Sequence, residues 1–209
     1  MEAALLVVLG WLLGILAGPI GERIRRRYSA DDLRKACLTE LLELRYTMAS
    51  CVELFHSRVG TLDHEILGWM EPIEAEYDGP DKDPRALEAV QKLKAMTPPA
   101  LAAAMAVRKA SFSGMSVKQY SMSFLDSQFA NLNILPVDLQ QRLLQVKDQL
   151  AIFNQDVVFL NKQFALTFQS DLGANYAVVM QNLTHGYGKL ASRARIIADA
   201  ITGIRDRYS

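Results

Sequence analysis

Residues 29–73, SADDLRKACLTELLELRYTMASCVELFHSRVGTLDHEILGWMEPI, carry the pattern that decides the fold. Apolar side chains recur here at steps of three or four, close to the roughly 3.6 residues of an α-helical turn. The sequence therefore predicts a long amphipathic helix. Its apolar positions are Leu33, Cys37, Leu41, Leu44, Met48, Val52, Phe55, Val59, Leu62, Ile66, Met70 and Ile73.

A capping motif and two helix-breaking residues set the expected limits of this helix. Ser29 to Asp32 is an S-x-x-D variant of the capping box, which marks a helix start. Gly60 weakens the helix, and Pro72 ends or bends it. As an alternative, the helix continues N-terminally through the preceding arginines and forms a rigid stalk.

Two more long helices are predicted towards the C-terminus, with a turn at Gly173 and Asn175 between them. Pro136 opens the first, and neither stretch shows the period-two alternation of a strand. The first stripe is Leu139, Leu143, Val146, Leu150, Phe153, Val157, Leu160, Phe164, Phe168 and Leu172. The second stripe has the alternating steps of a coiled coil: Tyr176, Val179, Leu183, Tyr187, Leu190, Ala194, Ile197, Ile201, Ile204 and Tyr208.

The segment between the first long helix and Pro136 is broken by turn residues. We expect a loop at 78–84, short helices at 84–96 and 97–110, a break at 111–116, and a weaker helix at 117–132.

The stretch that precedes the first helix predicts a membrane anchor. Residues 3–20, AALLVVLGWLLGILAGPI, are eighteen residues without a charge. At about 1.5 Å per residue they span about 27 Å, close to the roughly 30 Å of the hydrocarbon core. A buried core helix is the alternative. A cleaved signal peptide fits less well, because the basic residues follow the apolar run and 16–19 is a poor cleavage site.

The orientation of the anchor follows from its flanks. No lysine or arginine precedes it, whereas Arg23, Arg25, Arg26 and Arg27 follow it. These four residues are assigned to topology and lipid contact. The sequence thus predicts a single pass through the inner or plasma membrane, with the N-terminus outside. The predicted regions are an anchor at 1–21, a basic juxtamembrane segment at 22–29 and a cytoplasmic bundle domain at 30–209.

The complete fold prediction is all-α: a single N-terminal transmembrane helix followed by an antiparallel helical bundle of three long helices plus the broken middle segment. In an up-and-down arrangement the last helix descends towards the bilayer, and the acidic stretch at 71–83 lies at the far end. Basic residues of the last helix are then expected near lipid. They are Lys189, Arg193, Arg195, Arg205 and Arg207.

Composition excludes some classes of partner. The chain has 23 basic and 23 acidic side chains, so its bulk charge does not indicate nucleic-acid binding.

Cys37 and Cys51 lie fourteen positions apart on one predicted helix, about 21 Å, so they cannot bridge each other. Both fit the apolar stripe as buried thiols in a reducing compartment. An intermolecular disulfide is the alternative.

No motif in the chain predicts catalysis. Gly188-Lys189 lacks the other residues of a P-loop, and Ser116 lacks the second glycine of a hydrolase elbow. Glu53 and His56 form an ExxH pair, but a di-iron bundle needs a second pair, which the sequence lacks. We therefore predict no catalytic, cofactor-binding or metal-binding residue, no cofactor, and no small-molecule substrate.

Three features bear on association instead. Gly10, Gly14 and Gly18 form a ladder on one face of the anchor. Such a ladder allows close packing of helices, although glycine is also common in anchors generally. Phe159 lies off its helix's stripe and faces either another helix or a partner. The alternating spacing of the last helix also predicts an association stripe. It consists of Leu183, Tyr187, Leu190, Ala194, Ile197, Ile201 and Ile204.

The sequence thus favours a membrane-tethered interaction protein, a scaffold, adaptor or regulatory subunit at the cytoplasmic face rather than an enzyme. Its expected partners are membrane lipids and either another protein or a second copy of itself, and no nucleic acid. One alternative is a ligand- or stress-sensing module that signals through anchor-mediated oligomerisation. Another is a membrane-perturbing effector or toxin.

Overall fold

The structure is a computed structural model that describes the backbone of residues 2–111, 114–169 and 175–208. Side chains are described from residue 28 onward within the same ranges. Every regular element in these ranges is a helix. The predicted all-α helical bundle is therefore confirmed.

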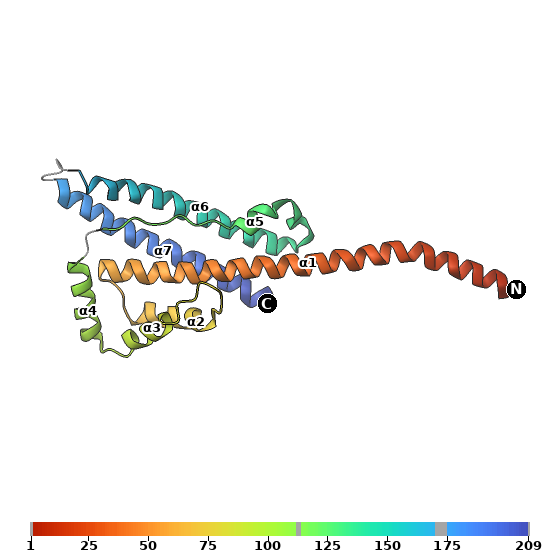
Figure 1. Cartoon of the computed structure of the whole chain (residues 1–209), viewed down its shortest axis with the longest axis horizontal. Coiled ribbons are helices and arrows are strands. Elements are labelled where there is room, and N and C mark those ends of the chain that lie inside the picture. Colours follow the sequence, from red (N-terminus) through yellow and green to blue (C-terminus); the bar gives the residue numbers. More distant parts are fainter. Residues whose placement is uncertain (1, 112–113, 170–174, 209) are drawn as a thin grey trace.

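Helix α1 runs without interruption from Glu2 to Val59. At about 1.5 Å per residue it is about 87 Å long. Its N-terminal part extends well beyond the bundle (Figure 1). The predicted helix start at 29–32 is therefore wrong, and the continuous helix given as the alternative is present. The reason is local: residues 22–32 contain neither proline nor glycine, and arginine is a good helix former.

The first helix ends earlier than its apolar stripe predicts. Gly60 has a φ of 79°. This left-handed conformation suits glycine at a helix C-terminus. Asp63 then caps α2 (His64–Glu76) by accepting a hydrogen bond from the Ile66 amide at 2.9 Å. Pro72 lies inside α2 and does not end it. The stripe nevertheless stays buried along its whole length, because α2 folds back along α1 and points its apolar face at the same core.

The middle segment contains the short helices α3 (Ala86–Lys94) and α4 (Pro98–Ala110), close to the predicted limits. After them, residues 114–122 are not helical, and only α5 (Ser123–Ser127) and the 3₁₀ helix η1 (Phe129–Ile134) follow. The predicted helix at 117–132 is therefore present only in its second half, as two short helices, and its first half, 117–122, is not helical.

Side chains of the long helices hold this non-helical segment by its backbone. Each of three side chains bonds both the N–H and the C=O of one residue, much as a neighbouring strand would. The pairs are Asn154 with Tyr120 (3.0 and 2.7 Å), Asn161 with Val117 (2.8 and 2.8 Å) and Tyr187 with Met115 (2.9 Å to the amide). These bonds satisfy the backbone groups that a helix would otherwise pair internally.

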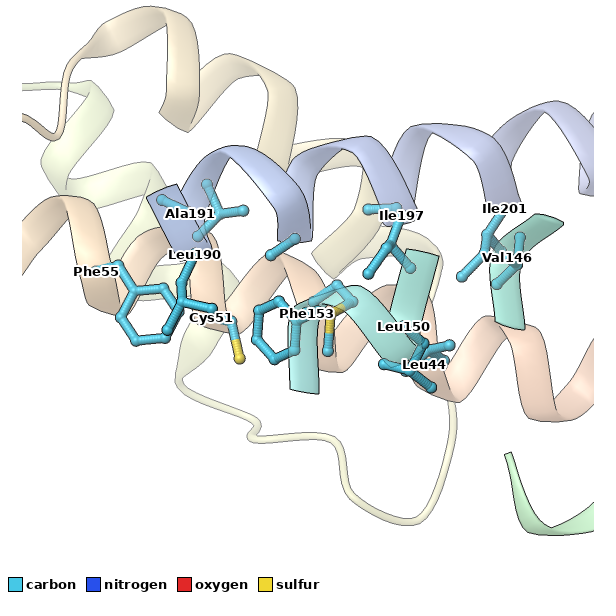
Figure 2. Packing of buried hydrophobic residues seen from close by; sticks show 14 of the residues in the cluster. Leu44, Cys51, Phe55, Val146, Leu150, Phe153, Leu190, Ala191, Ile197 and Ile201 are labelled. Carbon is cyan, nitrogen blue, oxygen red and sulfur yellow. The ribbon is translucent and has the colours of Figure 1, made fainter. Parts of the chain in front are cut away.

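Helices α6 (Val137–Leu166) and α7 (Tyr176–Tyr208) complete the bundle with α1. Figure 2 shows side chains from all three helices interleaved in one core, among them Leu44, Phe153 and Ile197. The α6 stripe is buried from Leu139 to Leu160, but Phe168 beyond it is 75% exposed. The predicted Leu172 and the turn at Gly173 lie outside the described residues.

The predicted up-and-down order is present, with one correction. The C-terminus lies beside α1 near the point where α1 leaves the bundle (Figure 1). The acidic stretch 71–83, however, does not lie at the far end but beside the middle of α1 and the last turns of α7: Glu76 accepts hydrogen bonds from Arg45 at 2.8 Å and from Arg205. The cause is the turn at Gly60, which sends α2 back along α1.

Candidate functional site

The residues predicted for anchor packing and for topology and lipid contact precede the part of the chain whose side chains are described. They are Gly10, Gly14 and Gly18 for packing, and Arg23, Arg25, Arg26 and Arg27 for topology and lipid contact. In the part of the chain whose side chains are described, no helix is long and apolar enough to cross a membrane. The anchor at 3–20 precedes that part, so it stays a prediction.

The predicted association stripe of α7 lies inside the chain's own core. All seven of its residues, from Leu183 to Ile204, are at most 1% exposed. They pack within the bundle that α7 forms with α1 and α6, as the labelled Leu190, Ile197 and Ile201 show in Figure 2. The alternating spacing thus serves intramolecular packing, and the stripe offers no surface to a second chain.

The two cysteines are free and buried, with exposed fractions of 2% for Cys37 and 5% for Cys51. Burial and the charge of Glu40 raise the pKa of the Cys37 thiol to about 11. Burial also raises the pKa of Cys51, whose sulfur lies 3.5 Å from the hydroxyl of Tyr120. Both thiols are therefore poor nucleophiles near neutral pH.

The ExxH pair does not act as a unit. His56 Nδ1 lies 2.8 Å from the hydroxyl of Thr61, whereas Glu53 lies 3.8 Å from Arg108 in an ion pair. Within the described ranges, no three histidine, cysteine or carboxylate side chains are arranged to hold a metal ion. Glu53 instead contributes to a pocket that no sequence motif indicated.

This pocket lies between α1, α2 and α3 and has a volume of about 290 Å³. We call it the carboxylate pocket, because three acidic side chains line it: Glu53, Glu74 and Asp83. Its remaining wall is largely apolar and includes Met70, Val90 and Leu93.

Glu74 is the central residue of the carboxylate pocket. Leu67, Met70 and Glu74 are spaced by three and four, so the helical period of α2 puts the carboxyl on the buried face. Glu74 is only 2% exposed, and no hydrogen bond or ion pair joins it to another described residue. A buried carboxyl is ordinarily paired, which makes this arrangement unusual.

The protonation of Glu74 reflects its surroundings. Burial raises the pKa of this carboxyl from 4.5 to about 7, with the charges of Glu53 and Asp83 acting in the same direction and Lys82 partly opposing them. The pKa of Glu53 is also raised, mainly by burial, against the nearby Arg108. Ionisation of these carboxyls is therefore unfavourable in the empty pocket, and a bound positive charge would make it more favourable.

The loop that carries Asp83 is held in place by two stacked tyrosines. The Asp83 amide donates to the hydroxyl of Tyr46 at 3.0 Å, and the Asp83 carboxylate accepts from the Arg85 amide at 2.9 Å. The Tyr46 ring stacks on Tyr77 with centroids 4.0 Å apart and planes 11° apart. The loop thus presents its carboxylate on a fixed support.

A second, more apolar pocket of about 420 Å³ is lined by Tyr77, whereas Tyr46, on which Tyr77 stacks, lines the carboxylate pocket. The Nε of Arg45 and the hydroxyl of Tyr77 are buried there without a hydrogen-bond partner among the described residues. A Cβ on Gly79 would lie 2.2 Å from that hydroxyl, so a larger residue here would displace the Tyr77 side chain. Arg45 and Arg205 both contact Glu76, so we assign this region to fastening α2 against α1 and α7.

Comparison of the chain with family models, with curated proteins and with solved structures gives no match.

Proposed function

We propose that this protein is a membrane-tethered helical interaction protein, a scaffold, adaptor or regulatory subunit at the cytoplasmic face of the membrane. The observation that carries the proposal is the continuity of α1. The helix that contains the predicted anchor at 3–20 also supplies the core residues 33–59 of the bundle. A bundle fused to its tether in this way is held at a fixed distance and orientation, as a docking platform requires.

The exposed ring of Phe159 supports a role in protein binding. This side chain is 64% exposed on α6, so it packs into neither of the two neighbouring long helices. Aromatic residues are enriched at protein interfaces, where they contribute much of the binding energy. We assign Phe159 to the contact with a protein partner.

Cysteine labelling tests the proposed topology. Residue 29 is exposed and is placed on the cytoplasmic side by the charge rule. We therefore expect a Ser29→Cys variant in intact cells to react with a membrane-permeant maleimide and not with an impermeant one. The wild-type chain is the control: its two buried thiols, with their raised pKa values, should stay unlabelled in the native state. Labelling of Ser29→Cys by the impermeant reagent would contradict the proposed orientation.

Crosslinking and affinity capture of the membrane-embedded chain test the proposed interaction. We expect the wild type to retain a specific protein and Phe159→Ser to lose at least about tenfold of it, since truncating an aromatic anchor costs about 2 kcal/mol or more. Gln155→Ser is the matched control, because Gln155 is exposed one turn away on the same helix. Equal capture by all three proteins would contradict the role of Phe159, and no capture by the wild type would contradict the scaffold.

A further inference from the structure

The carboxylate pocket between α1, α2 and α3 has the chemistry of a cation-binding site, which the proposed scaffold role does not use. We propose that it binds a small organic cation of the primary alkylammonium class. The ammonium group lies beside Glu74, and the alkyl chain lies against Met70, Val90 and Leu93.

The charge balance of the pocket favours a cation. Three carboxylates line it, and Arg85 is the one basic side chain among its described lining residues. Glu53 is partly neutralised by Arg108 at 3.8 Å. Lys82, the other nearby base, pairs with Asp78 at 3.9 Å instead of with Glu74. The carboxyl of Glu74 is thus left buried beside a cavity with no counter-charge in contact among the described residues.

The position of Glu74 is the independent sign of a ligand. An ionised carboxylate is costly to bury unless it is paired. Glu74 is nine-tenths or more buried, lines the cavity and has no hydrogen bond or ion pair with any described residue. A ligand that donates charged hydrogen bonds at this point supplies the missing partner.

The hydrogen-bonding groups select a primary ammonium. An –NH₃⁺ group has three donors and no acceptor, and ionised carboxylates only accept. Ser50 adds another oxygen in the pocket: its hydroxyl donates to the Tyr46 carbonyl at 3.1 Å, which leaves its lone pairs free to accept. A metal ion fits less well, because the described residues hold no set of three or more ligands arranged to hold one.

The walls and the volume set the rest of the ligand. Met70, Val90 and Leu93 are buried apolar residues that line the pocket, and such a wall favours a hydrocarbon chain. The volume of the pocket is about 290 Å³. Typical small-molecule sites begin at about 300 Å³, so this pocket is a small one and fits a chain of a few carbons.

Calorimetric titration of the full chain in neutral detergent micelles with butylamine hydrochloride tests the proposal, with butanol as the uncharged probe. At about pH 8 an alkylamine is still protonated, and Glu74 is ionised. We expect saturable binding of butylammonium and none of butanol. Equal binding of the two probes, or no saturable binding of either, would overturn the proposal.

Three variants localise the binding. Glu74→Gln keeps the size of the side chain and removes its charge, and should weaken binding by about tenfold or more. Glu88→Gln, an exposed position of the same α3 surface outside the pocket, should leave it unchanged. Ala89→Phe adds bulk at an exposed residue that lines the pocket and keeps all three carboxylates, and should also abolish binding. Binding by Glu74→Gln and Ala89→Phe at wild-type strength would place the ligand elsewhere and refute the assignment.

Discussion

Replacement of Tyr187 by alanine is expected to lower the free energy of unfolding by about 3–5 kcal/mol, the range for large aromatic truncations in a core. Tyr187 is fully buried, and its ring stacks on Phe55 with centroids 5.8 Å apart. Its hydroxyl also bonds both backbone groups of Met115. The truncation therefore leaves a cavity between α1 and α7 and releases one attachment of the 114–122 segment. Because typical proteins are stable by only about 5–15 kcal/mol, the loss is a large fraction of the total.

A Tyr187→Phe variant separates the two contributions. It keeps the ring and leaves the amide and carbonyl of Met115 without their partner, which should cost about 1–3 kcal/mol. Ile196→Ala is the matched control, since Ile196 lies on the same helix but is 51% exposed. This control should change stability by no more than about 0.5 kcal/mol. The measurement is chemical denaturation of the full chain in micelles, followed by far-UV circular dichroism. A loss below about 1 kcal/mol for Tyr187→Ala would show that this part of the core is not closely packed.

The sequence predicted the long helices well because their signal is local. Apolar residues at steps of three or four indicate which face of a helix is buried. The stripe residues from Leu33 to Ile73 are indeed all in the core. The same reasoning did not distinguish packing within the chain from association between chains. The α7 stripe has coiled-coil spacing in either case, and only the positions of α1 and α6 show that it is already covered.

The incorrect predictions depend on contacts between distant residues. Val117, Tyr120 and Phe124 have helical spacing, but Asn154, Asn161 and Tyr187 lie far along the chain and supply hydrogen bonds to residues 115–120 that replace those of a helix. The acidic stretch 71–83 was placed at the wrong end because one left-handed glycine, Gly60, reverses the chain direction. A weak helix breaker in a long stripe does not reveal how completely it will break the helix.

The candidate pocket was missed for a related reason. Glu74 falls on the apolar period of α2 with Leu67 and Met70, which is a signal that the sequence does contain. Its burial becomes complete only because α3 packs against α2, and no motif predicts that contact. The burial of this carboxyl thus depends on a contact between two helices and not on the local pattern of α2 alone.

Stability that falls as pH rises is the second large effect expected of this molecule. The pKa of Glu74 is about 7 in the folded chain against an ordinary value of 4.5, because the carboxyl is buried and faces Glu53 and Asp83. Below about pH 4.5 it is protonated in both the folded and unfolded states and costs nothing. Between about pH 4.5 and 7 only the unfolded state releases the proton, so the folded state loses relative stability. Each unit of difference between the folded and unfolded pKa corresponds to about 1.4 kcal/mol. The difference between 4.5 and about 7 therefore lowers the free energy of unfolding above pH 7 by an amount on the order of 3 kcal/mol.

Glu74→Gln removes the titrating group and isolates this effect from the other groups around the pocket. Glu53 on α1, and Lys82, Asp83 and Arg85 on the loop, are present in both proteins, so the difference between the two curves reports Glu74 together with its coupling to these groups. We expect the variant to be more stable than the wild type at about pH 8, by up to about 3 kcal/mol, and to lose this advantage at about pH 4.5.

Glu88→Gln should follow the wild-type curve above about pH 5, because the bond from Lys92 keeps the pKa of Glu88 below its ordinary value. Denaturation midpoints from pH 4.5 to 8 measure this, and parallel curves for the wild type and Glu74→Gln would show that the Glu74 carboxyl finds a counter-charge in the folded chain. Added butylammonium should selectively raise the wild-type curve at the alkaline end, since it binds the ionised form of the same carboxyl.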